Sequence, residues 1–289
     1  MQVTVIAPAK INLTLDVVGR RADGYHLLES VMQSVDYCDK LTAVRADTVT
    51  LRTVGGEVCP VEKNTAYRAA QAFFAHTGIT GGAAMTLHKH IPQQAGMGGG
   101  SADAAAALYA LDRLYDTHLS VDELCRIGVT VGADVPFCVM GGAAFAAGIG
   151  EELTPLPLMP DCAIVIAQPA DGVSTAEAYA AIDSRSIERY AGHPAMLAAI
   201  RAGDLDGICR GVYNVFESAT AIEGVRILRE RMAAFAPLAV QMTGSGSAVF
   251  AVFCDDAAAQ RCADSLQSDY ASVRVCRPCG GCRVTIENW

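Results

Sequence analysis

A glycine-rich loop is the part of this sequence best suited to chemistry. It runs from Gly96 to Ser101 and leads into an alanine-rich stretch, residues 101–114, that lacks Pro and Gly and predicts a helix. Glycines let backbone N–H groups approach phosphate oxygens closely, and the N-terminus of the following helix attracts negative charge. Asp103, in the first helical turn, would favour the helix or help arrange a phosphate-bound Mg²⁺. The loop therefore indicates a phosphate site, and a tight turn without a ligand is the alternative.

Two familiar phosphate-binding loops do not match this segment. No Gly-Lys-Ser/Thr follows the glycines, which excludes a Walker loop. A dinucleotide fingerprint fits only loosely, because Ser101 stands at its third glycine position and no strand-terminal acid follows about 20 residues later. The loop therefore belongs to another class of phosphate-binding loops.

A lysine and an aspartate elsewhere in the chain supply what phosphoryl transfer to an alcohol requires. That reaction needs positive charge on the phosphates, aligned reactants and a group that accepts the hydroxyl proton. Lys10 is one of only four lysines among 22 basic residues, and Asp134 stands between small and apolar residues. If they meet, the ion pair would orient Asp134 towards a substrate hydroxyl. The alternatives are a solvated surface lysine and a turn-forming aspartate.

Strands and helices that would position these residues alternate along the chain. Hydrophobic alternation and helix signals predict the elements of the first half: strands over residues 2–18, 31–46, 48–54 and 85–90, and helices over 64–76, 101–114 and 120–127. Asn64 is the possible N-cap of the first helix, and Ser120 and Glu123 form a capping box for the third. The same signals predict the second half: strands at 163–167, near Val273 and near Val284, a hairpin over 240–253, and helices over 176–182, 194–202, 222–234 and 257–267.

A proline-rich segment divides these elements into two groups. Residues 154–160 contain three prolines and form the best domain boundary in the chain. We therefore expect two domains, residues 1–155 and 156–289, in an α+β fold.

Composition limits where the protein works and what it binds. The chain has 289 residues, 52% of them hydrophobic, which is enough to bury a core. It has no apolar run of about 20 residues and no secretory signal, so we expect a soluble cytoplasmic protein without a membrane partner. A net charge of −9 argues against nucleic acid as a partner. Any polyphosphate must then bind at a local positive site.

Cysteines form a second candidate site near the end of the chain. The chain contains eleven, an odd number typical of small buried residues in a reducing compartment. Cys276, Cys279 and Cys282 have a spacing that could ligate zinc or an iron–sulfur cluster, but the local sequence lacks a fourth ligand, which Cys254 or Cys262 would have to supply. A Pro/Gly turn with cysteines as small residues is favoured, so we expect no protein-bound metal here.

Three segments together resemble the motifs of the GHMP kinase superfamily: residues 8–12, 92–103 and 242–247. Residues 20–26 and 131–136 are similar to one branch of it. The resemblance implies an ATP-dependent kinase that phosphorylates the 2-hydroxyl of the methylerythritol part of a cytidine diphosphate conjugate, in the non-mevalonate route to isoprenoids. It also implies an N-terminal domain like ribosomal protein S5 domain 2, a ferredoxin-like C-terminal domain, and a site between them.

The resemblance also implies roles for individual residues. Lys10 and Asp134 would form the catalytic pair, with Asn12 near the acceptor. Tyr25 and His26 would hold the cytosine by stacking and by hydrogen bonds, with Tyr179 as a second aromatic wall. Tyr25 could instead belong to the core. The remaining implied contacts are, for ATP, Asn64, Lys89, Pro92, Gln93, Gln94, Ala95, Gly96, Met97, Gly98, Gly99, Gly100, Ser101, Ala102 and Asp103, and for the substrates from the second domain, Gly244, Ser245 and Gly246.

This chain departs from the superfamily pattern in two places. Many relatives carry two serines after the glycines, whereas Ala102 stands at the second position here, so one hydroxyl that could contact phosphate or Mg²⁺ is missing. The ligands of the phosphate-bound Mg²⁺ are therefore left open. The cysteine motif at 276–282 is also outside the pattern.

Other functions compatible with the loop are a regulatory module that binds nucleotide without turnover, and a kinase that acts on homoserine or mevalonate. The pair Lys10 and Asp134 favours an enzyme, because a binding module needs no paired acid and base. Tyr25 and His26 favour the cytidine conjugate, because neither homoserine nor mevalonate carries a base to stack. We expect a monomer or a homodimer.

Overall fold

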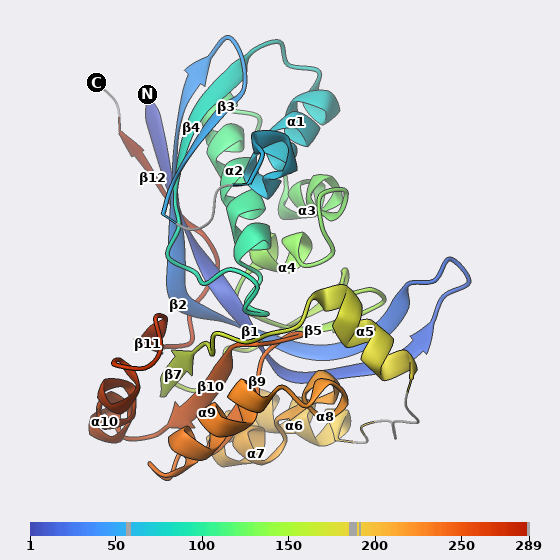
Figure 1. Cartoon of the computed structure of the whole chain (residues 1–289). Helices are drawn as coiled ribbons and strands as arrows, with labels where there is room; N and C mark the ends of the chain where they lie inside the picture. The colour runs from blue at the N-terminus through green and yellow to red at the C-terminus, as the bar shows by residue number, and fades with distance from the viewer. Residues whose placement is uncertain (56–58, 185–189, 191, 288–289) are drawn as a thin grey trace.

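Two long strands at the start of the chain organise the larger of two β-sheets (Figure 1). In the computed structural model, which describes residues 1–55, 59–184, 190 and 192–287, β1 (Gln2–Arg20) and β2 (His26–Ala46) pair antiparallel along most of their length. The strand order is β12-β1-β2-β4-β3, while β5 pairs with β2 and β6, and β8 pairs with β1. The other strands of this sheet are β3 (Thr50–Val54), β4 (Gly82–His88), β5 (Ala143–Ala147), β6 (Glu152–Leu156), β8 (Tyr213–Asn214) and β12 (Arg283–Glu287).

The pairing of β1 with β2 is irregular beside Lys10. The register shifts between Pro8 and Ala9. Proline has no N–H group to donate to the ladder, and such a bulge re-aims the side chains that follow. The irregularity therefore lies where the sequence predicts a functional lysine.

Four helices cover one face of this sheet in Figure 1: α1 (Thr65–Thr77), α2 (Gly99–Tyr115), α3 (Val121–Val129) and α4 (Val135–Met140). The central helix is α2, whose alanines at 104, 105 and 107 are fully buried, so that it packs closely. Asn64 caps α1 by accepting from Ala66 N, and Ser120 and Glu123 form the capping box of α3, as predicted. The first cap fixes the start of α1, where Thr65 contacts Gly100 of the glycine loop, and the second fixes the start of α3 beyond the C-terminal end of α2.

The second sheet has the order β11-β7-β10-β9 and is antiparallel throughout. Alternate residues of β7 face two different cores: Ile164 and Ile166 join the core that includes β1, whereas Ala163, Val165 and Ala167 face a second core with the helices of the second half. The smaller sheet is therefore packed on both faces. Its strands are β7 (Ala163–Ala167), β9 (Ala239–Met242), β10 (Val249–Phe253) and β11 (Val273–Cys276), and the helices of this half are α5 (Thr175–Asp183), α6 (His193–Ala202), α7 (Leu205–Arg210), α8 (Val215–Thr220), α9 (Glu223–Ala233) and α10 (Asp256–Leu266).

The predicted division at residues 155 and 156 falls at the end of β6, the last strand of the larger sheet before β7 starts the smaller one. Two later strands return to the larger sheet: β12 pairs antiparallel with β1, and β8 pairs parallel with it. The two domains stay a prediction. Within the described ranges, no helix is both long and apolar enough to span a bilayer.

Candidate active site

A cavity of about 700 Å³ collects most of the residues predicted to bind or react. Both halves of the chain contribute to its walls, the first mainly through the glycine loop and the second through the turn between β9 and β10. The predicted residues that line it are Lys10, Asn12, Asn64, Lys89, Pro92, Gln93, Gln94, Ala95, Gly96, Met97, Gly98, Gly99, Gly100, Asp103, Asp134, Tyr179, Gly244, Ser245 and Gly246. Ser101 instead lines a neighbouring cavity, and Ala102 is fully buried and lines neither.

The glycine loop adopts a backbone that side chains would not tolerate. Gly96 and Gly98 have φ of 72° and 69°, in the left-handed region that favours glycine. A Cβ on Gly96 would overlap the main-chain oxygen of Thr243, and one on Gly244 would lie 2.6 Å from the oxygen of Gly96. Direct backbone contact therefore joins this loop to the β9–β10 turn, with the start of α2 facing the cavity.

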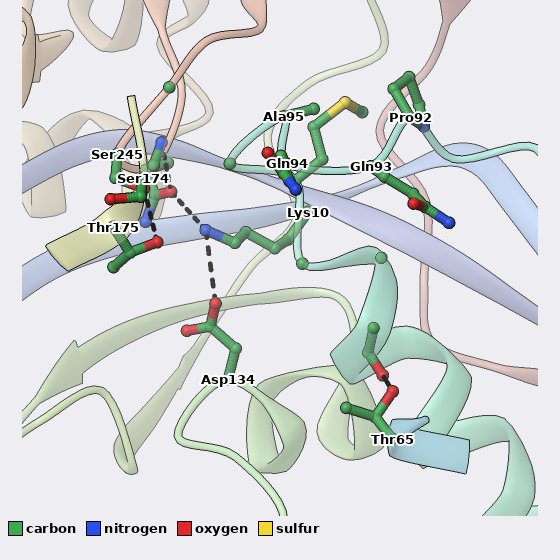
Figure 2. Close-up of a pocket in the computed structure, with 18 of the residues that line it drawn as sticks. Lys10, Thr65, Pro92, Gln93, Gln94, Ala95, Asp134, Ser174, Thr175 and Ser245 are labelled. Carbon is green, nitrogen blue, oxygen red and sulfur yellow. Dashed lines mark hydrogen bonds and ion pairs between the residues drawn. The ribbon is translucent and has the colours of Figure 1, made fainter. Parts of the chain in front are cut away.

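Lys10 crosses the floor of the cavity towards Asp134 (Figure 2). Its Nζ lies 3.7 Å from Asp134 Oδ2 and donates to Asn12 Oδ1 at 2.7 Å. The Lys10 side chain is 5% exposed, whereas that of Asp134 is 37% exposed. Asp134 is the N-cap of α4 but its side chain makes no capping hydrogen bond, so the carboxylate is available to the cavity. The predicted contact between Lys10 and Asp134 is confirmed.

Asn12 connects the lysine to the second half of the chain. Its Oδ1 also accepts from Gly244 N at 3.0 Å, and its Nδ2 donates to Ser30 Oγ at 2.8 Å. Asn214 holds the same turn from the other side, because its Nδ2 donates to Gly244 O at 2.9 Å. The turn at Gly244 is therefore fixed by two buried amides, one from each half of the chain.

Lys89 is held by two buried carboxylates beside the loop. Its Nζ contacts Asp39 Oδ2 and donates to Asp103 Oδ2 at 2.7 Å, and all three side chains are at most 6% exposed. Burial raises the pKa of Asp103 to about 8, although Lys89 opposes that shift. Burial alone would lower the pKa of Lys89, but Asp103 and Asp39 together raise it above its ordinary value. The ammonium therefore stays charged next to the expected phosphates.

Several residues in or next to the cavity were not predicted from the sequence. Asp39 lies on the same face of β2 as the buried residues Tyr37 and Leu41. An acid at an inward position of a strand was therefore the sequence signal that could have identified it. The hydroxyl groups of Thr175 and Ser245 lie 3.2 Å apart at the second-half wall, and Thr65 Oγ1 donates to Gly100 O at 2.6 Å. Single hydroxyl residues at helix starts and in turns carry no such signal.

A second cavity of about 610 Å³ adjoins the first and contains the predicted base-binding aromatics. Tyr25 is 60% exposed, so the interpretation as a core residue is wrong. His26 stacks on Tyr179 with ring centroids 4.5 Å apart, and its Nε2 lies 2.8 Å from Asp183 Oδ1 of α5. His26 thus covers one face of Tyr179, an arrangement that a sequence of separate aromatics cannot indicate. Asp134 and Tyr179 line both cavities.

Within the described ranges, no group of three or more His, Cys, Asp or Glu is placed to hold a metal, the cysteines of residues 276–282 included. All the cysteines are free. Cys262, considered as a fourth ligand, belongs to the core of the second half, whereas Cys276 belongs to the core that includes β1. Burial raises the pKa of Cys279 and of Cys282 to about 12, which disfavours the thiolate form that binds metals.

Comparisons with known proteins define the class of this protein. Residues 64–142 match the family described as GHMP kinases N terminal domain, and residues 196–272 match GHMP kinases C terminal. The chain belongs to the GHMP kinases, a family of small-molecule phosphotransferases.

Similar proteins indicate which members of this family the chain resembles. A Listeria monocytogenes protein named 4-diphosphocytidyl-2-C-methyl-D-erythritol kinase is 39% identical, over 96% of this chain and 97% of its own length. A Clostridium novyi protein of the same name is 38% identical, over 94% and 98%. A solved structure of 4-(cytidine 5'-diphospho)-2C-methyl-D-erythritol kinase superposes with a TM-score of 0.79 at 33% identity, covering 96% of this chain and all of that one. A homoserine kinase structure from Cytophaga hutchinsonii, 20% identical with a TM-score of 0.78, shows the fold alone.

Proposed function

We propose that this protein transfers the γ-phosphoryl group of ATP to the 2-hydroxyl of 4-diphosphocytidyl-2-C-methyl-D-erythritol, in the non-mevalonate route to isoprenoid precursors. The names of relatives 38–39% identical over nearly the whole chain support this acceptor. The observation that carries the proposal is the position of Asp134, which lines both the glycine-loop cavity and the aromatic cavity. A group at this junction lies where a phosphate donor and an alcohol acceptor would meet.

The contacts of Asp134 support a role as the group that accepts the hydroxyl proton. The acceptor oxygen forms a bond to the γ-phosphorus while the bond from that phosphorus to the β–γ bridging oxygen breaks, and ADP leaves. The hydroxyl proton passes to Asp134, whose carboxylate makes no cap hydrogen bond. Lys10, 3.7 Å from Asp134 Oδ2, orients that carboxylate and places positive charge near the transferred group.

The glycine loop, Lys89 and the start of α2 would hold the triphosphate of ATP. The loop presents main-chain groups without side chains, and the α2 N-terminus adds positive potential. Mg²⁺ fits this site as a cation carried by ATP, since Asp134 supplies a carboxylate at the wall of the cavity, and it would neutralise charge on the phosphates.

The aromatic cavity would hold the cytidine end of the acceptor. Tyr25 is exposed at its rim, and the stacked pair of His26 and Tyr179 forms one wall. Exposed aromatic faces favour a base over the small acids homoserine and mevalonate. The cavity therefore favours the cytidine conjugate.

A coupled assay of ADP release tests the acceptor. We expect turnover with 4-diphosphocytidyl-2-C-methyl-D-erythritol and at most a trace with mevalonate or homoserine. No ADP from the first compound would contradict the proposed function.

Asp134→Asn tests the mechanism, because it keeps the size of the side chain and removes the proton acceptor. We expect kcat to fall by about 10²- to 10⁴-fold, while ADP affinity measured by calorimetry stays within about twofold. The control is Asp116→Asn, the same change at a side chain that is 81% exposed, which should leave both quantities unchanged. Turnover that survives Asp134→Asn would rule out this role for Asp134.

A further inference from the structure

Asp39 is a buried acid to which the proposed mechanism assigns no part. It lies in β2 and its side chain is 1% exposed. Each carboxylate oxygen has its own partners: Oδ2 contacts Lys89 Nζ, while Oδ1 accepts from the main-chain N–H groups of His90 at 2.5 Å and Ile91 at 2.9 Å. One side chain therefore fixes three consecutive residues at the point where β4 ends and the segment leading to the glycine loop begins.

Lys89 needs a fixed counter-ion because of where its ammonium lies. A Cβ on Gly99, the first residue of α2, would be 3.4 Å from Lys89 Nζ. The ammonium therefore lies next to the positive N-terminal end of α2, and the two repel each other. This pair of positive groups suits a triphosphate, but in its absence the ammonium is held there only if negative charge offsets the repulsion.

Asp39 and Asp103 both contact the Lys89 ammonium, from different sides. Asp103 lines the cavity, so an arriving phosphate competes with it for the Lys89 ammonium. Asp39 does not line either cavity, so we expect its contacts with Lys89 and with the chain at His90 and Ile91 to persist when a phosphate binds. Asp39 is therefore the counter-ion that a nucleotide does not displace.

We propose that Asp39 is a positioning residue for the nucleotide: it holds the Lys89 ammonium against the start of α2 and fixes the entry of the glycine loop, so that both are ready for the phosphates of ATP. This inference rests on the proposed function only in that the loop binds ATP. It is independent of the acceptor.

Asp39→Asn separates the charge of Asp39 from its main-chain contacts. The amide oxygen of Asn can still accept from His90 and Ile91, but the charge beside Lys89 is lost. We expect ADP affinity by calorimetry and the KM for ATP each to worsen by about 10- to 100-fold, the range known for the loss of residues that orient metal ligands. The KM for the acceptor should stay within twofold.

Asp112→Asn is the matched control. Asp112 is also a buried aspartate, 3% exposed, whose Oδ1 accepts from Leu119 N at 2.8 Å and from Thr117 Oγ1 at 2.8 Å near the far end of α2. The change should lower thermal stability through these contacts and leave ADP affinity within twofold. A general effect of disturbing a buried acid would instead weaken ADP binding in both variants and overturn the inference.

A double variant shows whether Asp39 acts through Lys89. Lys89→Gln combined with Asp39→Asn leaves no unpaired charge between these two positions, so it provides a folded protein even where Asp39→Asn alone does not. Its ADP affinity should equal that of Lys89→Gln alone, because Asp39 has no ammonium left to place. Additive losses would overturn the inference.

The same measurements keep the proposals apart. Wild-type protein that binds no ADP would overturn both. Wild-type protein that binds ADP without turning over the cytidine conjugate would overturn the proposed acceptor alone. Equal ADP affinity in the wild type and in Asp39→Asn would overturn the positioning role alone.

Discussion

Asp103 shows how one buried carboxyl group can set the charge of a phosphate site. Its side chain is 4% exposed, and its Oδ1 has no hydrogen-bond partner in the part of the chain that the structure describes. Burial raises its pKa to about 8, with Lys89 acting in the opposite direction and Asp39 in the same one. Near neutral pH the group is largely protonated, so that one ammonium faces one carboxylate instead of two. The cavity then attracts phosphate more strongly.

Because of this raised pKa, we expect ATP binding to weaken as the pH rises. As the pH rises through about 8, Asp103 ionises and adds negative charge beside the triphosphate, so we expect the KM for ATP to rise by about tenfold. Asp103→Asn should remove this rise, and Asp116→Asn, at an exposed position, should retain it. Initial rates between pH 6 and 9.5 measure the effect. An equal rise in Asp103→Asn would assign it to another group.

The same shift affects stability, because a raised acid pKa favours the folded state only while the group is protonated. The contribution is fully present below about pH 4, the ordinary pKa of an aspartate, and is lost as the pH rises to about 8. Urea unfolding at pH 5 and at pH 9 should therefore show a smaller loss of stability for Asp103→Asn than for the wild type.

The sequence predicted those residues of the site that belong to recognisable motifs. Lys10 and Asp134 meet as predicted, and the loop residues 92–100 line one cavity. Asp39 was missed because it lies in the middle of a strand, far along the chain from the lysine it contacts. The stacking of His26 on Tyr179 was also missed, because it depends on how Asp183 of α5 packs against β2. Contacts between residues that are far apart in the sequence can be identified only once the fold is known.

At the scale of elements, the glycine loop and the β9–β10 turn act as one unit. A Cβ on Gly96 would overlap Thr243 O, and Ala248 N donates to Ala95 O at 3.2 Å. The loop therefore keeps its shape only while the turn from the second half of the chain lies against it. This contact explains why residues 92–103 and 242–247 occur together in the sequence.

Gly96→Ala tests this contact. The new methyl group must move the β9–β10 turn, so we expect the KM for ATP to rise by at least about tenfold, the effect of misplacing binding groups by an ångström or so. Gly78→Ala is the control: its φ of 67° is equally unfavourable for alanine, but nothing lies within 4 Å of the new methyl. It should cost about 1 kcal/mol of stability and leave the KM for ATP unchanged. Equal effects in the two variants would mean that backbone strain, not the contact, matters at Gly96.

Long or capped helices and several short strands, such as β7 over residues 163–167, were predicted well, whereas the shortest helices were not. The alanine-rich helix and the helix with the capping box are both present as α2 and α3. The helices α4, α7 and α8 have six residues each, too few turns to show a period of 3.6. The two-residue strand β8 is defined by its partner β1 alone. The strand β12 was predicted, but not its pairing with β1, because pairing over such a distance leaves no local pattern.

At the scale of the whole molecule, the chain crosses repeatedly between its two sheets. It leaves the larger sheet after β6, returns briefly at β8, and returns again at β12, which pairs with the first strand, β1 (Figure 1). The cavity lies where these crossings meet, with walls from both halves. The chain has a net charge of −9, so we expect anionic substrates to depend on the positive groups that Lys10, Lys89 and the start of α2 supply at this cavity.

Because β8, β12 and the two loops join the halves, we expect the whole protein to unfold in one thermal transition although two domains are predicted. Calorimetry should give a calorimetric enthalpy equal to the van't Hoff enthalpy. ADP at about 100 times its Kd should stabilise the folded state by about 2.7 kcal/mol, which raises Tm by roughly 5 °C for a chain of this size. The entire transition should move, since the nucleotide contacts both halves. Two resolved transitions, of which ADP moves only the one belonging to residues 1–155, would instead show that the second half leaves the site independently.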